Sequence, residues 1–515
     1  MRVVLLVVLL PLLAPAMAHA QFDVTAFSVT PSGLQAGSHP DVTIHAEFSP
    51  NEHVRDLTIS LPPGLVGDPT SKPRCTQAAF QADTCPAASR VGSTSVRTVI
   101  PPLQLVPVDA TGDVYNVVPS AGEPARLGVV VRPPLGASKV FIASPVRIRP
   151  SDGGLDSVIT NMPTTVGLPL LGQVEMFIEA MDLTLASPFV SLPTSCKPAQ
   201  ARIAAVSTAG VAASRDAAPF TPTGCDKVPF APRLEATVAS TRLPELQTVI
   251  TVPRGHASTA SAAVTLPRTL AVNPVALGDL CTLDEQAAGP CPPRARVGSA
   301  EARTPLLAQP LAGPVTLAAL ANQPLPGLRM DLSGAASLSL VGVVELSPIR
   351  TTFAGIPDVP LERFALTFDA NRTLAARGNL CRGPEPRIVA DLTGHNGATA
   401  RLDEPISVTG CALPEARLTV NRRKLLLTVA ALRGRPLQRV SVKLPRGVRL
   451  KRNAVARANG QRLRRVRGRS VIVRQAAARH FSIRGTVSRR LGKRQVALET
   501  LDSTGRVVRQ RLRAR

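Results

Sequence analysis

The chain has 515 residues, 44% of them hydrophobic, but it contains no tryptophan and a single tyrosine. This composition disfavours sugar binding by aromatic stacking and single-stranded nucleic-acid binding on aromatic platforms. The net charge of +25 is unevenly spread, since residues 417–515 hold 30 Lys or Arg and only two carboxylates, Glu499 and Asp502. Residues 1–416 hold the other 30 basic residues and 33 acidic ones, so the chain is a near-neutral body with one basic end.

The first residues have the pattern of a secretory leader. Arg2 supplies a positive charge, Val3 to Leu13 form an apolar run, and Ala18-His19-Ala20 match an A-x-A cleavage site before Gln21. The alternative, a retained membrane anchor, is disfavoured because the run is too short to span a bilayer and contains a proline. We therefore expect a signal peptide over residues 1–20, no transmembrane segment after its cleavage, and a secreted or cell-surface protein.

Two stretches of the body are similar to each other. Cys75 is followed after nine residues by Cys85-Pro-Ala-Ala-Ser-Arg-Val-Gly-Ser93, and Cys281 after nine residues by Cys291-Pro-Pro-Arg-Ala-Arg-Val-Gly-Ser299. A strand that runs into a Leu-Pro turn precedes each stretch, and a further cysteine pair follows it. Such repetition indicates an internal duplication. We expect one β-rich unit over 21–232, a second copy over 233–414, and a basic Arg-rich β-module over 415–515.

The strand signals favour an all-β fold. The 49 prolines and 36 glycines leave few windows long enough for a free-standing helix. Alternation over residues 91–100, 140–148 and 337–341, all bounded by Pro or Gly, is typical of short strands. We predict tandem β-sandwich-like units and a smaller basic C-terminal β-module, with one short helical piece at 76–82.

The basic end also carries strand signals. Apolar residues alternate with Arg over 469–474 and 481–484, and residues 496–501 and 507–508 flank a Gly-containing turn, which predicts a hairpin. Enough Val, Leu and Ile are present to bury one face of such strands. We therefore expect a folded module and not a disordered tail.

Eight cysteines in an exported chain favour disulfides. Sequence alone allows many pairings, and the duplication reduces them because each copy should be self-contained. Metal or nucleophile chemistry is the alternative, but no copy has the ligand spacing of a zinc site, and the histidines do not recur at matching places. We expect four disulfides: Cys75–Cys85, Cys196–Cys225, Cys281–Cys291 and Cys381–Cys411.

No catalytic motif is present in the sequence. The G-x-S-x-G elbow, the H-E-x-x-H pair, the P-loop and the dinucleotide fingerprint are all missing. The loop 151–156 offers Asp152 and Asp156 to calcium, but a plain Asp-Gly turn is the commoner interpretation. We expect no enzyme, no cofactor and no metal site.

The basic residues of the C-terminal module point to a partner. Dense like charge destabilises a fold by self-repulsion unless anions are near, which favours an anion-binding surface over a merely solubilising one. For an exported protein, the expected partner is an anionic cell-wall polymer, an acidic polysaccharide or an anionic lipid surface, and nucleic acid is not expected. The candidate residues are Arg449, Lys451, Arg452, Arg462, Arg464, Arg465, Arg467, Arg469 and Arg474.

Several motifs of the first copy resemble a family. They are Leu61 to Pro69, Cys75 to Ser93, Val114-Tyr115-Asn116 followed by Gly122 to Ala125, and Pro193 to Cys196. They resemble uncharacterised secreted repeat proteins of high-GC actinobacteria, over residues 22–225. The second copy lacks the Tyr-Asn and Gly-Glu-Pro-Ala elements. The resemblance implies an exported, β-rich protein and brings no activity, cofactor or binding residue.

These observations predict a non-catalytic secreted or cell-envelope protein with a structural or adhesive role. Its two units would serve as a spacer or stalk, and its basic module would bind anionic surface polymers. The alternative is a secreted hydrolase of unrecognised type with a site between the two repeat units. A hydrolase would bring acidic or nucleophilic side chains together in one pocket of the fold, whereas a stalk would not.

Overall fold

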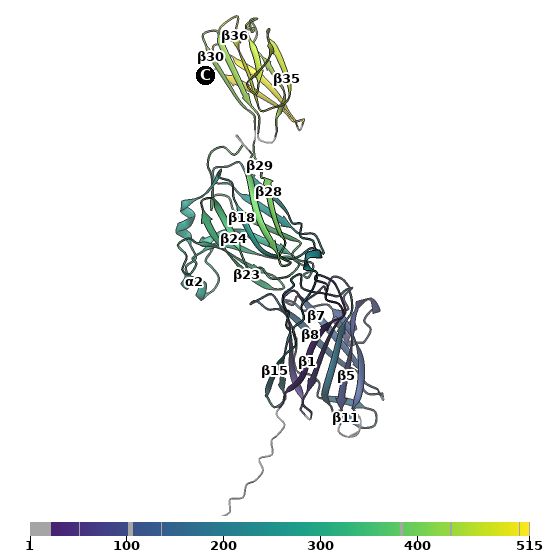
Figure 1. The fold of residues 1–515 in the computed structure, drawn as a ribbon. Helices are drawn as coiled ribbons and strands as arrows, with labels where there is room; N and C mark the ends of the chain where they lie inside the picture. Colours follow the sequence, from purple (N-terminus) through teal and green to yellow (C-terminus); the bar gives the residue numbers. More distant parts are fainter. Residues whose placement is uncertain are drawn as a thin grey trace, which may run out of the picture.

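The computed structural model describes residues 22–513 except 51, 101–106, 135, 382–384, 412, 433–434 and 504, so the predicted signal peptide lies outside the described residues. The described chain is nearly all β, which confirms the predicted fold class. Figure 1 shows three bodies in a row: an N-terminal unit, a middle unit and a C-terminal module. Within the described residues, no helix is both long and apolar enough to span a bilayer.

The N-terminal unit is built on one antiparallel sheet of eleven strands, in the order β1-β2-β12-β5-β6-β7-β8-β9-β3-β14-β15. Two small sheets accompany it, β4 with β13 and β10 with β11. The elements are β1 (Val24–Pro31), β2 (Val42–Phe48), β3 (Val54–Leu61), β4 (Val66–Gly67), α1 (Gln77–Gln81), η1 (Ala87–Ser89), β5 (Arg90–Val99), β6 (Val108–Val117), β7 (Ala125–Arg132), β8 (Val140–Ile148), β9 (Leu155–Ile159), β10 (Thr165–Leu168), β11 (Gly172–Glu175), β12 (Phe177–Leu185), β13 (Val190–Ser191), β14 (Arg202–Ser207), β15 (Ala212–Asp216) and η3 (Cys225–Lys227).

The middle unit is built on a sheet of twelve strands, in the order β29-β16-β17-β25-β20-β21-β22-β23-β24-β18-β27-β28, with β19 and β26 as a separate pair. The elements are β16 (Arg233–Ala239), β17 (Leu246–Thr251), β18 (Thr259–Thr265), β19 (Leu270–Val272), η4 (Pro274–Asp279), α2 (Leu283–Ala288), η5 (Pro293–Ala295), β20 (Arg296–Arg303), β21 (Leu311–Ala318), β22 (Gly327–Ser333), β23 (Ser337–Leu346), β24 (Ile349–Phe353), β25 (Arg363–Phe368), β26 (Leu374–Ala376), β27 (Arg387–Gly394), β28 (Thr399–Pro405) and β29 (Ser407–Thr409).

The two units have the same strand order. Eleven strands of the N-terminal sheet correspond one to one, in sheet position and in chain order, to eleven strands of the middle sheet. The order β1-β2-β12-β5-β6-β7-β8-β9-β3-β14-β15 matches the order β16-β17-β25-β20-β21-β22-β23-β24-β18-β27-β28. The pair β4 and β13 likewise matches the pair β19 and β26. Two different sequences therefore encode one topology.

Each large sheet curls around a hydrophobic core, so that β1 approaches β15 in the N-terminal unit and β16 approaches β28 in the middle unit. In the N-terminal unit, Arg215 of β15 donates from Nε to the carbonyl oxygen of Val24 in β1, at 2.8 Å. Along β2, every second side chain from Val42 to Phe48 is buried, because strand side chains alternate between the two faces of a sheet. The period-two pattern of the sequence thus sets which face turns inward.

The structure contains four disulfides, each within one unit: Cys75–Cys85, Cys196–Cys225, Cys281–Cys291 and Cys381–Cys411. Cys75 and Cys281 are fully buried, and each pairs through its backbone with a strand of the large sheet. The N–H of Cys281 donates to the carbonyl oxygen of Leu317 at 2.9 Å. The two disulfide loops that begin at Cys75 and Cys281 are therefore bound to the large sheets by backbone hydrogen bonds.

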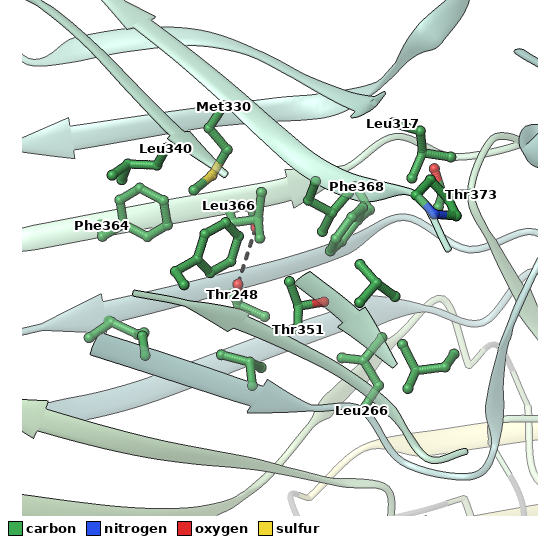
Figure 2. A pocket seen from close by; sticks show the side chains of 18 of the residues that line it. Thr248, Leu266, Leu317, Met330, Leu340, Thr351, Phe364, Leu366, Phe368 and Thr373 are labelled. Carbon is green, nitrogen blue, oxygen red and sulfur yellow. Dashed lines mark hydrogen bonds between the residues drawn. The ribbon is translucent and has the colours of Figure 1, made fainter. Parts of the chain in front are cut away.

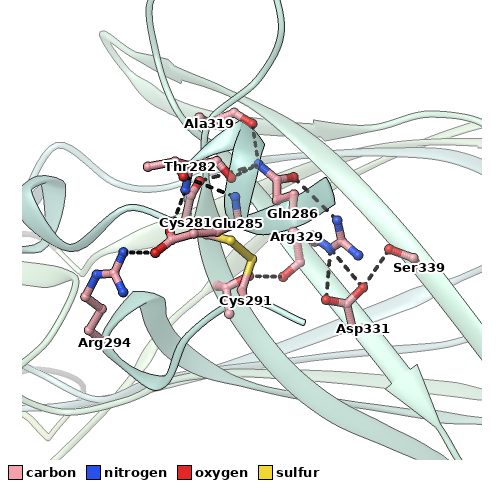
Figure 3. Close-up of a disulfide and its surroundings, with 11 residues drawn as sticks. Cys281, Thr282, Glu285, Gln286, Cys291, Arg294, Ala319, Arg329, Asp331 and Ser339 are labelled. Atoms are coloured by element: carbon pink, nitrogen blue, oxygen red, sulfur yellow. Dashed lines mark hydrogen bonds and ion pairs between the residues drawn. A yellow bond between two sulfur atoms is a disulfide. The ribbon is translucent and has the colours of Figure 1, made fainter. Parts of the chain in front are cut away.

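A short helix lies inside each of the two shorter disulfide loops. Helix α1, which confirms the helical piece predicted at 76–82, is capped by the hydroxyl of Thr76. Helix α2 was not predicted, and it begins with a capping box in which Thr282 and Glu285 satisfy each other's backbone N–H groups (Figure 3). A hydrogen bond from Arg294 also holds the pKa of the Glu285 carboxyl below its ordinary value.

The Arg-Val-Gly-Ser motif that both units share has a structural reason. A Cβ atom on Gly92 would lie 2.1 Å from the carbonyl oxygen of Thr184, and one on Gly298 would lie 2.0 Å from that of Thr367. Each glycine follows a register shift, where β5 meets β6 and where β20 meets β21. Only glycine allows the neighbouring strand to approach so closely.

The C-terminal module consists of two sheets, in the orders β30-β31-β36-β33-β34 and β35-β32-β37-β38, around a core that includes Leu427, Leu437 and Val496. Strands β37 and β38 form the hairpin that the sequence predicts. The elements are β30 (Glu415–Asn421), β31 (Lys424–Ala430), β32 (Leu437–Lys443), β33 (Val455–Ala458), β34 (Gln461–Arg465), β35 (Ser470–Ala478), β36 (His480–Thr486), β37 (Gln495–Asp502) and β38 (Val507–Arg513).

The N-terminal and middle units meet through buried polar contacts. The carboxylate of Asp358 accepts hydrogen bonds from the backbone N–H and the hydroxyl of Thr194, at 3.1 and 2.8 Å. The same hydroxyl accepts from the N–H of Ser258, and Asn396 donates to the carbonyl oxygen of Val228 at 2.8 Å. These contacts fix the first two bodies of the row to each other.

Candidate functional site

Four loops gather at one end of the C-terminal module. They are the turn 421–424, the loop 444–454, the loop 466–469 and the loop 487–494, and this end is named the basic tip. All of its cations are exposed, and no carboxylate lies in any of the four loops. The thirteen cations are Arg422, Arg423, Lys424, Arg446, Arg449, Lys451, Arg452, Arg467, Arg469, Arg489, Arg490, Lys493 and Arg494.

Backbone hydrogen bonds join the four loops. Leu450 forms bridges with both Gly468 and Val487, and the N–H of Val487 donates to the carbonyl oxygen of Arg423 at 2.8 Å. The N–H of Ser488 donates to the carbonyl oxygen of Arg449, also at 2.8 Å. The cations are therefore carried on a connected frame of backbone, which holds them close together.

The strand registers place the basic tip away from the middle unit. The connection from the middle unit enters at Glu415, which faces Ala430, and Ala430 in turn faces His480. At the other end of the same strands, Asn421 faces Lys424, and Lys424 faces Thr486, next to the tip loops. The tip thus lies at the end of the module opposite to the connection.

The two carboxylates of residues 417–515, Glu499 and Asp502, lie outside the tip. Glu499 pairs with Arg439 and Arg509 on the strands, at 3.4 and 2.9 Å. Asp502 is buried at the β37–β38 turn, where it accepts a hydrogen bond from the N–H of Arg506. On β33 and β34, Arg457 lies directly opposite Arg462, and such like-charge pairs destabilise a sheet. The charge of the module is thus largely uncompensated by its own acids.

The structure separates the nine predicted anion-binding residues. Arg449, Lys451, Arg452, Arg467 and Arg469 belong to the tip. Arg462, Arg464 and Arg465 follow along the edge strand β34, and Arg474 lies within β35 of the other sheet. All nine side chains are exposed, and they are distributed over the tip, the edge strand β34 and strand β35.

Sequence reasoning missed eight tip residues: Arg422, Arg423, Lys424, Arg446, Arg489, Arg490, Lys493 and Arg494. They are distant in sequence from the dense 462–474 stretch, and the strand pairing brings them together. A partial signal was available, because the basic residues of 487–494 lie between 481–484 and 496–501, whose alternation indicates strands, and therefore in a turn. Which turns share one end of the module follows from the strand pairing and not from this local pattern.

The loop 151–156 is organised by an arginine. Arg149 donates to both carboxylate oxygens of Asp152, at 2.9 Å, and to Asp156 at 2.6 Å. The hydrogen bond with Asp152 also holds the pKa of Arg149 above its ordinary value. The two carboxylates considered for calcium are therefore already paired with one cation, Arg149. In the part of the chain that the structure describes, no group of three or more His, Cys, Asp or Glu is placed to hold a metal ion.

A polar pocket of about 260 Å³ lies between the N-terminal and middle units, where the alternative hypothesis places a hydrolytic site. His39 and Ser191 line it, with Nδ1 of His39 2.9 Å from Oγ of Ser191 and 3.2 Å from the carbonyl oxygen of Val190. Nδ1 of His39 accepts from the hydroxyl of Ser191 in one tautomer and donates to the carbonyl oxygen of Val190 in the other. This pairing alone does not identify a nucleophile.

Asp358 in this pocket serves the junction between the units. We expect Asp358→Ala to lower the stability of the coupled units by about 3 kcal/mol, because it removes the acceptor of two buried donors, the N–H of Thr194 and the O–H of Thr194. Calorimetric unfolding of the mature chain should show the loss. Glu362→Gln, which alters a carboxylate of the same pocket that pairs with exposed Arg254, serves as the control. Equal melting curves for the two variants would show that Asp358 does not hold the junction.

No protein-family model matches the chain, and no curated protein matches it at a significant level.

Proposed function

We propose that the protein is a non-catalytic extracellular protein that is held at a cell-envelope surface by its basic tip. The observation that carries the proposal is the gathering of thirteen exposed cations, from four loops, at one end of the C-terminal module. The signal peptide predicted at residues 1–20 supports export, and four disulfides fit an oxidising compartment.

The partner that fits the tip is an anionic polymer or surface of the cell envelope. A cation near an anionic surface contributes about 1 kcal/mol, and several on one rigid frame act together. Ten of the thirteen cations are arginines, whose planar guanidinium groups bind phosphate and carboxylate bidentately. The two sandwich-like units would then serve as a spacer or stalk that extends from the bound tip (Figure 1).

Neutralising the tip should abolish binding to anionic polymers. We expect a mature chain in which Arg449, Lys451, Arg467, Arg469, Arg489 and Arg490 are replaced by Gln to bind poly(glycerol phosphate) at least a hundredfold more weakly than the parent. The interaction should also weaken steeply between 0.1 and 1 M salt, as the Debye length falls from about 10 Å to about 3 Å. Titration calorimetry at several salt concentrations measures both effects.

The matched control removes the same charge from outside the tip. Arg417, Arg435, Arg457, Arg462, Arg474 and Arg479 are exposed and lie in none of the four loops. Their replacement by Gln should change the affinity less than tenfold. Equal losses in the two variants would show that net charge alone matters and would remove the tip as a site. An acidic polysaccharide and vesicles that contain anionic lipid, tested in parallel, identify the class of surface.

A further inference from the structure

The hairpin of β10 and β11 in the N-terminal unit carries two uncovered leucines at its turn. The side chain of Leu170 is fully exposed, the most exposed of the large apolar side chains among the described residues, and Leu171 is 58% exposed. No residue from 165 to 174 carries a charge. The three side chains of the turn, residues 169–171, are therefore all hydrocarbon and reach into the surroundings of the protein.

The backbone of the turn holds Leu170 outward in a strained conformation. Its φ is +68°, in the left-handed region that glycine and asparagine adopt far more readily than leucine. Leu168, two residues earlier in the chain, is buried. Strained positions persist where the surrounding structure fixes them, and they gather at functional sites. A leucine in this conformation points to a use for its exposed side chain.

The hairpin is fixed to the rest of the N-terminal unit. The N–H of Gly167 donates to Oγ of Ser138 at 2.9 Å, and the N–H of Ser138 donates to the carbonyl oxygen of Gly167 at 2.8 Å. At the base, Nε2 of His53 lies 2.8 Å from Oε1 of Glu175, and the His53 ring stacks on Phe177 with 4.2 Å between the centroids. The two leucines are thus presented on an ordered frame, which lowers the entropy cost of binding.

The hairpin lies at the end of the N-terminal unit away from the middle unit, where Figure 1 shows β11. The chain enters the unit at the same end. Phe177 begins β12 directly after the hairpin, Ala180 of this strand faces Glu47 of β2, and Val24 at the start of β1 faces Phe48. The leader predicted at residues 1–20 is joined to this end, so export by that leader brings the hairpin to a membrane.

The middle unit uses the corresponding segment for a different contact. Residues 354–362 connect β24 to β25, as the hairpin segment connects β9 to β12. They contact protein through a polar group, since Asp358 accepts two hydrogen bonds from Thr194. The turn of the hairpin has no polar side chain, and two leucines are far smaller than the roughly 1,200 Å² that a specific protein interface buries. A fluid bilayer needs no complementary surface, so it fits this turn better than a folded partner.

We propose that the β10–β11 hairpin inserts Leu170 and Leu171 into a lipid bilayer, as a shallow and reversible contact. The hydrocarbon of the bilayer is the partner, so the contact does not require an anionic headgroup. A small apolar anchor binds weakly by itself and acts together with a second contact. The basic tip lies at the other end of the row of bodies, so the two ends bind different surfaces (Figure 1). The proposal shares with the proposed function only the predicted export.

Tryptophan fluorescence tests the insertion, because the chain contains no tryptophan. Leu171→Trp in the mature full-length chain places one indole at the turn, and Val275→Trp, at a position of the middle unit that is 73% exposed, is the matched control. The probe is phosphatidylcholine vesicles in about 1 M salt, which carry no net charge and leave a Debye length of about 3 Å. We expect the emission of the Leu171→Trp chain alone to shift to the blue, with half-saturation at about 1 mM lipid. Bromine-labelled acyl chains should quench it.

Leu170→Asn, added to the Leu171→Trp chain, separates binding from folding. Asparagine adopts the left-handed conformation more readily than leucine, so the melting temperature should stay the same or rise. The affinity for the vesicles should fall at least tenfold, because one leucine no longer leaves water. A loss of affinity with an unchanged melting curve is the result that a merely structural role of Leu170 does not produce.

Three results would overturn the proposal. They are an unshifted emission up to about 10 mM lipid, equal shifts in the Leu171→Trp and Val275→Trp chains, and a dimer in sedimentation equilibrium that Leu170→Asn abolishes. The last result would assign the turn to a second copy of the chain. Neutral vesicles in high salt do not engage the basic tip, and poly(glycerol phosphate) contains no acyl chain. Failure of this proposal is therefore distinct from failure of the proposed function.

Discussion

Replacing Gly92 or Gly298 by alanine is expected to destabilise the unit that contains it by about 3 kcal/mol or more. The added Cβ atom would lie 2.1 or 2.0 Å from a backbone carbonyl oxygen of the adjacent strand, so β12 or β25 would have to move. Backbone within a sheet cannot yield as the end of a flexible side chain can, and overpacking of this kind commonly costs 1–3 kcal/mol or more. Calorimetry or denaturant unfolding of the mature chain measures the effect.

Two other glycines provide the controls for this experiment. Gly33 in the N-terminal unit and Gly278 in the middle unit have no heavy atom within 4 Å of a built Cβ, and neither has a positive φ. Alanine at these positions should change the free energy of unfolding by less than about 1 kcal/mol. If Gly92→Ala and Gly33→Ala melt alike, the close approach of β5 and β12 is not a requirement of the fold.

Removing a disulfide should destabilise one unit and leave the other unchanged. Closing loops of 10 residues restricts the unfolded chain, which is worth about 3 kcal/mol for each of Cys75–Cys85 and Cys281–Cys291. Replacing both cysteines of a pair by alanine avoids a free thiol and a buried hydroxyl. We expect each double variant to lower the unfolding transition of its own unit in calorimetry.

The two double variants are controls for each other. The Cys75 and Cys85 pair lies in the N-terminal unit and the Cys281 and Cys291 pair in the middle unit, at matching places in one topology. Identical shifts of both transitions in either variant would show that the two units unfold as a single body. An unchanged melting curve would show that the loop is held by its backbone bridge to the sheet and not by the disulfide.

The fold class was accessible from the sequence because strands leave a local signal. Alternating residues of β5 and β8 and frequent turn residues are sufficient to indicate short strands. Helix α2 was missed although Thr282 and Glu285 have the three-residue spacing of a capping box, a pattern that is also local. The pattern is short, and Gly289-Pro290 follows it closely, a dipeptide that favours a turn over a helix.

The basic tip and one apolar cavity depend on pairing between distant strands, which no local pattern specifies. Arg423 and Arg489 belong to different turns, and these turns are joined because the N–H of Val487 donates to the carbonyl oxygen of Arg423. The apolar cavity inside the middle unit, which Leu317, Met330 and Phe364 help to line (Figure 2), exists because side chains from strands distant in sequence leave space where they meet, and a gap of this kind follows from packing. The Arg-Val-Gly-Ser motif lies between these two cases. Its repetition is visible in the sequence, but the need for glycine follows only from the distance between a Cβ atom at that position and the carbonyl oxygen of Thr184 or Thr367.

The burial of Cys75 and Cys281 has a consequence for the order in which the protein matures. Both sulfur-bearing residues are fully covered once their backbones have joined β6 and β21, so an oxidising enzyme reaches them only before that step. Because all four bonds close short segments within one unit, each bond can form without waiting for the rest of the chain. Late oxidation of Cys75 or Cys281 would instead require its loop to detach from the sheet first.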